Sequence, residues 1–297
     1  MKVFYSPRYE IALPGHIWPT SKYRLVAERL GASSPAFSDA SWDDLALVHT
    51  REYLDKLRTN TLTADDLATL ELPWAPGLID GFRLMVGGTS AAAGAALDEG
   101  RAAHLGGGLH HAFANHGEGF CPLNDVAVAI RVLQAPSTRS ARSGQARAIR
   151  RAAVVDCDVH HGNGTAMIFE RDPDVFTFSI HQQHNYPLFK PRSDLDVGLE
   201  DGAGDERYLT ALAGALPRVL DSRPELIVYL AGADPFEHDR LGGLKLTKRG
   251  LAERDRMVGA AAREAGVPLV TVLAGGYAAD VRDTVDIHVA TIEAMIE

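Results

Sequence analysis

The stretch VVDCDVHHGNG, residues 154–164, decides the fold class of this chain. It begins in a short apolar run, residues 152–156, which predicts a strand buried on both faces. Side chains two residues apart on a strand face the same side, so Asp156 and Asp158 point together, and His160 follows where the strand ends. A carboxylate and an imidazole at this spacing predict half of a metal site. The alternative is a pair of acids that cap the next helix.

Further apolar runs predict strands of the same kind, at residues 2–5, 103–105, 175–180, 226–231 and 269–273. Amphipathic stretches predict helices between them, near residues 21–31, 77–99, 205–220 and 247–266. Strands that alternate with helices are typical of an α/β fold, in which helices cover both faces of a parallel sheet. No break in composition divides the sequence, so we expect a single domain over residues 1–297.

Composition narrows the class of protein. A formal charge of −9 argues against a protein that coats nucleic acid, because phosphate binding needs an excess of Lys and Arg. The two cysteines, Cys121 and Cys157, form no CxxC pair, which favours a reducing, cytoplasmic setting. We find neither a secretory signal nor the ~20 apolar residues of a membrane span. The sequence gives no indication of oligomeric state.

Segment 136–151, PSTRSARSGQARAIRR, differs from its surroundings because it carries five arginines and no acid. We expect a mobile surface loop here. The alternative is a patch for an anionic partner.

Four polar or glycine-rich clusters each follow a predicted strand, at residues 106–111, 156–163, 232–239 and 274–277. The carboxyl ends of parallel strands meet at one edge of a sheet, where ligand sites assemble. The sequence therefore predicts one site built from four separated segments.

Asp234 completes the metal half-site begun by Asp158 and His160. It follows the apolar run at residues 226–231, and so belongs at the same sheet edge. One imidazole and two carboxylates provide three protein ligands and leave a fourth coordination position open. An open site of this kind is what a catalytic Zn²⁺ requires, so we expect one zinc ion per chain.

Three further side chains are candidates for proton transfer. His110 and His111 follow three glycines, which let the backbone approach a ligand closely. Tyr277 follows a predicted strand and two glycines, where its phenol is placed to donate a hydrogen bond to an oxyanion. The alternatives are solvated loop histidines and a tyrosine packed in the core.

Taken in order, these clusters resemble the histone deacetylase superfamily, over nearly the whole chain from YSPRY (5–9) to LAGGY (273–277). GGGLHHAFANHGEGFCPLND (106–125) and VDCDVHHGNG (155–164) carry the resemblance. ADPFEHDRLGGLKLTKRGL (233–251) and the compact length are most similar to class IV members and to bacterial histone-deacetylase-like amidohydrolases. The resemblance implies the arginase/deacetylase fold, with an eight-stranded, mainly parallel sheet between helices.

The resemblance also implies roles for individual residues. His110 and His111 match the catalytic histidine pair, with Asp156 behind the first and Asn163 behind the second. Tyr277 matches the tyrosine that polarises the substrate carbonyl. The residues that match the zinc ligands are Asp158, His160 and Asp234. The residues that match the wall of the narrow acyl-lysine channel are Gly119, Phe120 and Tyr186. The residues that resemble the monovalent cation site beneath the zinc, usually occupied by potassium, are Asp156, Asp158, His160, Ser179 and Ile180.

Two stretches depart from the family pattern. HQQHNYPLFKPRSD (181–194) lacks the glycine-rich PGTG sequence, and LELPWAPG (70–77) offers no clear match to the rim aspartate that grips the substrate backbone. Both departures concern the mouth of the channel, so they leave the substrate open without touching the metal chemistry.

The function implied is a zinc-dependent amidohydrolase that removes an acyl group from acetyl-lysine or a longer fatty acyl-lysine in a protein or peptide. An alternative substrate is an acetylpolyamine or another acylated small amine. A two-manganese ureohydrolase is disfavoured, because Gly162 and Gly232 stand where its additional carboxylates would be. A non-catalytic acyl-binding module would have lost a ligand, the histidines or the tyrosine, and none is missing.

Overall fold

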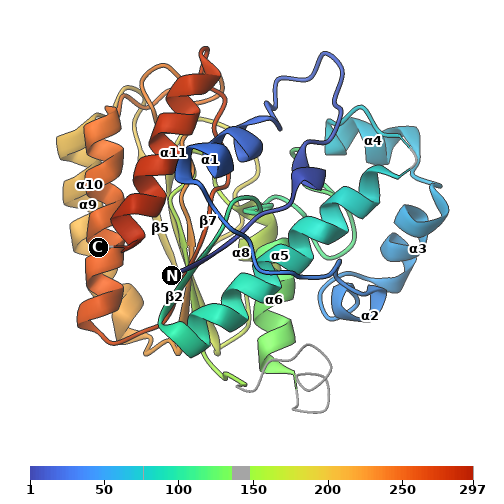
Figure 1. Ribbon diagram of the computed structural model, residues 1–297, viewed down its shortest axis with the longest axis horizontal. Coiled ribbons are helices and arrows are strands. Elements are labelled where there is room, and N and C mark those ends of the chain that lie inside the picture. The colour runs from blue at the N-terminus through green and yellow to red at the C-terminus, as the bar shows by residue number, and fades with distance from the viewer. Residues whose placement is uncertain (76, 136–147, 297) are drawn as a thin grey trace.

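The computed structural model describes residues 1–75, 77–135 and 148–296 (Figure 1). Its centre is a seven-stranded sheet in the order β1-β2-β7-β6-β3-β4-β5, and every pairing in it is parallel. The strands are β1 (Lys2–Phe4), β2 (Arg101–His104), β3 (Ala152–Asp156), β4 (Val175–Gln182), β5 (Leu195–Leu199), β6 (Leu226–Leu230) and β7 (Leu269–Val272). The expected α/β class is confirmed.

The strand count differs from the eight that the family resemblance implied. Among the described residues no further segment pairs with the edge strands β1 and β5, so the sheet ends at seven strands. Strand β5 was itself not expected from the sequence. It pairs with β4 alone, its residues alternate between partly buried and exposed, and it contains Gly198. An edge strand of this kind lacks the continuous apolar run that identified its neighbours.

Helices cover both faces of the sheet (Figure 1). The helices on one face are α1 (Lys22–Leu30), α9 (Asp205–Asp221), α10 (Lys248–Glu264) and α11 (Val281–Ile296). Those on the other face are α5 (Leu78–Glu99), α6 (Asp125–Gln134) and α8 (Asn163–Phe169). Beyond α5 lie α2 (Trp42–Leu45), α3 (Arg51–Thr59) and α4 (Ala64–Leu70), while a 3-10 turn, η1 (Pro7–Tyr9), follows β1. The expected helices correspond to α1, α5, α9 and α10.

Along strand β3, the pleat sends alternate side chains to opposite faces of the sheet. Val155 and Cys157 pack into the core beneath α9 and α10, whereas Val154 packs into the core on the opposite side of the sheet. Asp156 and Asp158 alternate with Cys157, and all three side chains are buried. The sheet therefore directs the two carboxylates away from the larger core and toward the loops at its carboxyl edge.

Strand order explains why the four clusters meet. The strands that precede them, β2, β7, β6 and β3, are consecutive neighbours at the centre of the sheet, although they are far apart in the sequence. Their carboxyl ends consequently lie side by side at one edge.

Two further features concern the surface. The segment 136–151 was expected to be a mobile loop. Its residues 136–147 lie outside the described part of the chain, and residues 148–151 are described. Of its last residues, Ile149 is buried, and the backbone N–H groups of Arg150 and Arg151 donate to the carboxylate of Glu225 at 2.8 and 2.9 Å. Within the described residues, no helix is long and apolar enough to cross a membrane.

Candidate active site

A pocket opens at the carboxyl edge of the sheet. The residues that line it and that the sequence had singled out are His110, His111, Gly119, Phe120, Asp158, His160, Tyr186 and Tyr277. Asp156, Asn163 and Asp234 do not line the pocket, but each contacts a residue that does. The structure thus brings the predicted catalytic, metal-ligating and channel residues into one place.

The candidate metal group consists of Asp158, His160 and Asp234, whose ligand atoms lie within 4.8 Å of one another. Nδ1 of His160 is 3.0 Å from Oδ1 of Asp158 and 3.4 Å from Oδ2 of Asp234. Backbone N–H groups fix both carboxylates, because Gly275 donates to Oδ2 of Asp158 at 2.8 Å and Val159 donates to Oδ1 of Asp234 at 2.9 Å. All three side chains are buried.

The donor atoms fit a divalent cation. Within the described residues, Oδ2 of Asp234 is buried and accepts no hydrogen bond. Burial and the neighbouring charge of Asp158 raise the pKa of Asp234 to about 7. Two buried carboxylates side by side are unfavourable unless a cation neutralises them. One imidazole and two carboxylates are also a set of donors that Zn²⁺ accepts in an open site.

Arg254, on α10, ties together the strand ends that carry the ligands. Its Nη1 donates to the carbonyl of Gly232 at 2.6 Å and to that of Cys157 at 3.3 Å. The guanidinium is fully buried and is paired with Asp255 at 2.8 Å. A buried charge needs such a partner, and together the pair holds the ends of β3 and β6 at a fixed separation.

The paired histidines differ in what stands behind them. Nδ1 of His110 is 2.7 Å from Oδ2 of Asp156, and Nδ1 of His111 is 2.7 Å from Oδ1 of Asn163. Burial alone would lower the pKa of His110, but the charges of Asp156 and Asp158 outweigh it and raise that pKa to about 9. Burial holds the pKa of His111 well below its usual value, and the charge of neighbouring His110 lowers it further. The pair therefore combines a cationic and a neutral imidazole.

The turn that carries these histidines is held by Asp125, at the start of α6. Its carboxylate accepts the backbone N–H of Gly108 at 3.0 Å and of Leu109 at 2.7 Å, and it also accepts the hydroxyl of Thr89. Gly107 and Gly108 have φ of 72° and 76°, a conformation that side chains with a Cβ rarely adopt. Sequence reasoning missed Asp125, because an acid at a helix start is usually only a cap.

Tyr277 reaches the pocket from the loop after β7. Its backbone N–H donates to Oδ2 of Asp239 at 2.6 Å. The same carboxylate group accepts the N–H of Leu241 at 2.8 Å, which orders a second stretch of the pocket wall. Burial, with the charges of Asp158 and Asp234, raises the pKa of the Tyr277 phenol well above its usual value. The phenol therefore stays protonated and can donate a hydrogen bond. Asp239 was not predicted as its support.

Aromatic rings form the wall of the pocket. The ring centroid of Tyr186 lies 5.1 Å from that of His111 at an interplanar angle of 89°, and Phe120 lies 6.1 Å from Tyr277 at 73°. Trp18 and Tyr23 extend the apolar lining. Glu71 also lines the pocket. It comes from LELPWAPG, the stretch in which the sequence showed no clear rim acid.

Of the residues expected to hold a monovalent cation, Asp156 lies on β3, Ser179 and Ile180 lie on β4, and Asp158 and His160 follow the end of β3. Asp156 of β3 and Ser179 of β4 are register partners across the sheet. Oδ1 of Asp156 accepts the backbone N–H of Asp158 at 3.1 Å, and the Ser179 hydroxyl is 2.9 Å from Nδ1 of His181. Neither Ser179 nor Ile180 lines the pocket.

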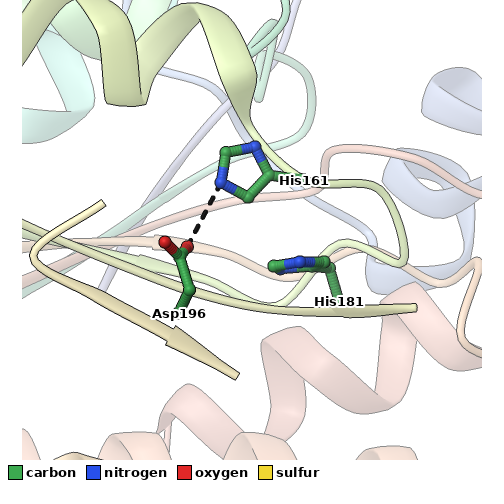
Figure 2. A group of neighbouring side chains, drawn as sticks. All are labelled: His161, His181 and Asp196. Carbon is green, nitrogen blue, oxygen red and sulfur yellow. Dashed lines mark hydrogen bonds and ion pairs between the residues drawn. The ribbon is translucent and has the colours of Figure 1, made fainter. Parts of the chain in front are cut away.

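A second group with the composition of a metal site lies near β5 (Figure 2). Nε2 of His161 is 3.2 Å from Oδ1 of Asp196, and the rings of His161 and His181 are 4.7 Å apart. Asp196 also accepts the backbone N–H of Ser193 at 2.9 Å. None of these three residues lines the pocket, and His181 contacts Ser179 of the expected monovalent cation site.

Comparison with known proteins identifies the family of the chain. The histone deacetylase domain family matches residues 18–292. An uncharacterized protein of Picosynechococcus is 40% identical over 96% of this chain and 95% of its own length. Histone deacetylase 2 of Arabidopsis thaliana is 31% identical over 93% of this chain and 74% of its own, and a histone deacetylase-like amidohydrolase of Pseudomonas aeruginosa is 33% identical over 82% and 65%.

Solved structures support the same fold. The crystal structure of the HDA15 HD domain superposes with a TM-score of 0.74 and 23% identity, and the match covers 100% of this chain and 91% of that one. Members of the histone deacetylase family are hydrolases that act on amide bonds. The family match over most of the chain, together with the assembled site, leads to one conclusion: the chain belongs to the histone deacetylase family and is a hydrolase of amide bonds.

Proposed function

We propose that this enzyme is a zinc-dependent amidohydrolase that removes an acyl group from an acylated amine, with acyl-lysine as the main substrate class. The observation that carries the proposal is the meeting of three parts in one pocket: the metal group, the histidine pair and a protonated tyrosine. The printed names of the relatives, histone deacetylase and amidohydrolase, support the same chemistry.

We assign the zinc ion to Asp158, His160 and Asp234. When bound there, zinc would supply Lewis-acid activation of the amide carbonyl and of water. The charge of the two carboxylates offsets that of the cation, so the site benefits from a base beside it. His111, neutral because its pKa is lowered, takes the proton from the attacking water.

The remaining steps use the other side chains of the pocket. Tyr277 donates its phenol proton as a hydrogen bond to the oxygen that becomes negative in the transition state, a contribution worth about 3–4 kcal/mol. His110, cationic beside Asp156, stabilises the developing negative charge. The imidazole that took the proton from water returns it to the leaving amine, which completes cleavage of the C–N bond.

The shape of the pocket favours an apolar acyl chain. Its wall is made largely of rings, with Phe120 and Tyr186 beside Trp18 and Tyr23. Apolar lining of this kind suits an acetyl group and also a longer fatty acyl group. Glu71 adds a carboxylate to the lining, which favours an acylated polyamine as a second candidate substrate, because such a molecule carries a further positive charge.

Two subsidiary assignments complete the proposal. We place a monovalent cation, K⁺, among Asp156, Asp158, His160, Ser179 and Ile180, supported by the pairing of Asp156 with Ser179 across β3 and β4. We place the enzyme in the cytoplasm, supported by two free, buried cysteines.

The test is a substrate panel assayed with zinc-loaded enzyme. It contains lysine peptides with acyl chains graded from acetyl to long fatty acyl, and polyamines with the same acyl groups. We expect amide hydrolysis with kcat/KM highest for acyl-lysine peptides. Preference for the polyamines would move the substrate class to small amines. Absence of hydrolysis across the panel by a zinc-loaded, folded enzyme would overturn the proposal.

A further inference from the structure

A carboxylate stands behind the amide that supports His111. Nδ2 of Asn163 donates to Oε1 of Glu118 at 2.6 Å, while Oδ1 of the same amide is 2.7 Å from Nδ1 of His111. The three side chains form a continuous hydrogen-bonded series, from His111 through Asn163 to Glu118. The family resemblance placed Asn163 behind His111 but assigned no role to Glu118.

The backbone holds Glu118 in place. Glu118 and Cys121 exchange hydrogen bonds, with the N–H of Glu118 donating at 3.2 Å and that of Cys121 at 2.9 Å. The two residues between them, Gly119 and Phe120, have φ of 51° and 68°, as in the tight turns that join β-hairpins. A Cβ at position 119 would lie 2.8 Å from the His111 ring, so this turn packs closely against the imidazole.

Glu118 is charged and nearly surrounded. Its side chain is 18% exposed, and the Tyr186 hydroxyl donates to Oε1 at 3.2 Å. Burial would raise the pKa of Glu118, but hydrogen bonds from His116, Asn163 and Tyr186 outweigh it and lower that pKa below its usual value. An ionised carboxylate has acceptors only.

This restriction decides how the amide of Asn163 is turned. An amide has a donor end and an acceptor end, and either end can face the histidine. Because Glu118 only accepts, the NH₂ group of Asn163 must face it, which leaves Oδ1 facing Nδ1 of His111. A neutral His111 then carries its proton on Nδ1 and keeps a lone pair on Nε2. The reverse orientation would place the proton on Nε2, and the imidazole would be unable to accept one there.

We propose that Glu118 is a positioning residue that orients Asn163 and thereby fixes the tautomer of His111 in which Nε2 is the base. This role rests on the proposed function for its kinetic consequence, but the tautomer itself does not depend on it. Through Tyr186, the same carboxylate also links the base to the channel wall.

The test combines Glu118→Gln and Glu118→Ala with a direct reading of the tautomer. Long-range ¹H–¹⁵N correlation spectra of zinc-loaded, ¹⁵N-histidine-labelled enzyme distinguish Nδ1–H from Nε2–H, and His111→Ala assigns the signal. We expect a neutral Nδ1–H form in the wild type. Glutamine has the shape of glutamate but both a donor and an acceptor end, so Glu118→Gln permits both orientations and should show a mixture of tautomers.

The kinetic reading is a fall in kcat of about an order of magnitude in Glu118→Gln with KM changed less than twofold. This is less than the 10²–10⁴-fold expected for full loss of acid–base catalysis. The matched control is Glu264→Gln, which makes the same change at an exposed glutamate on α10 and should leave the tautomer of His111 unchanged.

The proposal is overturned if both Glu118 variants keep the pure Nδ1–H form, or if Glu264→Gln shifts the tautomer as much as Glu118→Gln does. A wild-type enzyme without amidase activity would refute the proposed function instead, and the spectra would still decide the role of Glu118.

Discussion

Nδ1 of His110 lies 2.7 Å from Oδ2 of Asp156, so the first histidine of the pair is bound to a full negative charge. Its neighbour His111 is bound at the same distance to the neutral amide of Asn163. The rings are 4.1 Å apart, and a charge on one disfavours a charge on the other. The environment therefore separates two identical side chains into a cation and a base, as paired titratable groups are separated in other active sites.

This asymmetry predicts unequal roles. Replacing His111 with Ala should lower kcat/KM at neutral pH by 10²–10⁴-fold, roughly the contribution of a general base. Zinc content should be unchanged, because His111 is outside the ligand group. Steady-state kinetics with elemental analysis would check both values. An active His111→Ala enzyme would transfer the role of base to His110.

Tyr277→Phe isolates the hydroxyl that faces the developing oxyanion. We expect folding and zinc content to stay as in the wild type, because the ring and its backbone contact with Asp239 remain. Turnover should fall by roughly two to three orders of magnitude. Equal kcat values for the two enzymes would show that the phenol has no such part.

Asp125 predicts a link between stability and activity. In Asp125→Ala the backbone N–H groups of Gly108 and Leu109 lose their acceptor. Hydrogen bonds to a charged group are worth about 1.5–3 kcal/mol each, so the free energy of unfolding should fall by about 3 kcal/mol or more. Denaturant titration measures this loss, with exposed Glu264→Gln as a control expected to stay within about 0.5 kcal/mol. A loss no larger than that of the control would contradict the role of Asp125.

His49 predicts how stability depends on pH. Burial lowers its pKa to about 4, and its ring is bound on both sides, by the carbonyl of Phe113 at 3.0 Å and the N–H of Asn124 at 3.1 Å. The unfolded chain has a His pKa near 6.5, so between about pH 6.5 and 4 only the unfolded state takes up this proton. Folded stability contributed by neutral His49 is therefore present above pH 6.5 and lost as the pH falls, by roughly 3 kcal/mol at pH 4.

His49→Gln provides the comparison, since an amide can replace both hydrogen bonds without titrating. Its unfolding free energy should fall less steeply over that range, although His104 and His181, whose pKa values are also lowered by burial to about 3, will still contribute. Parallel curves for wild type and variant would exclude His49 as a source of the acid sensitivity.

The parts of the site that depend on a local sequence pattern could be predicted from the sequence. Alternation along β3 placed Asp156 and Asp158 together. The helix expected near residues 247–266 is α10, and the hydroxyl of Thr247 at its start accepts the N–H of Gly250 at 3.0 Å. Asp234 was found because it directly follows a continuous apolar strand.

The residues that position the site residues could not be predicted from local sequence patterns, for a physical reason. Asp125, Asp239, Glu118 and Arg254 act on segments from 16 to 97 positions away, through contacts that exist only after the strands have assembled. Their local patterns are an acid at a helix start, an acid in a loop and an arginine within a helix, and all three are those of ordinary surface residues. Strand β5 was missed because a partly exposed edge strand has no continuous run of apolar residues in the sequence.

The central claim is that Asp158, His160 and Asp234 hold one zinc ion that hydrolysis requires. Titrating chelator-treated enzyme with Zn²⁺ while assaying amide hydrolysis tests it most directly. We predict that activity rises linearly and saturates at one equivalent. Asp234→Ala should neither retain zinc nor recover activity. Full activity without metal, or a full equivalent of zinc retained by Asp234→Ala, would contradict the account.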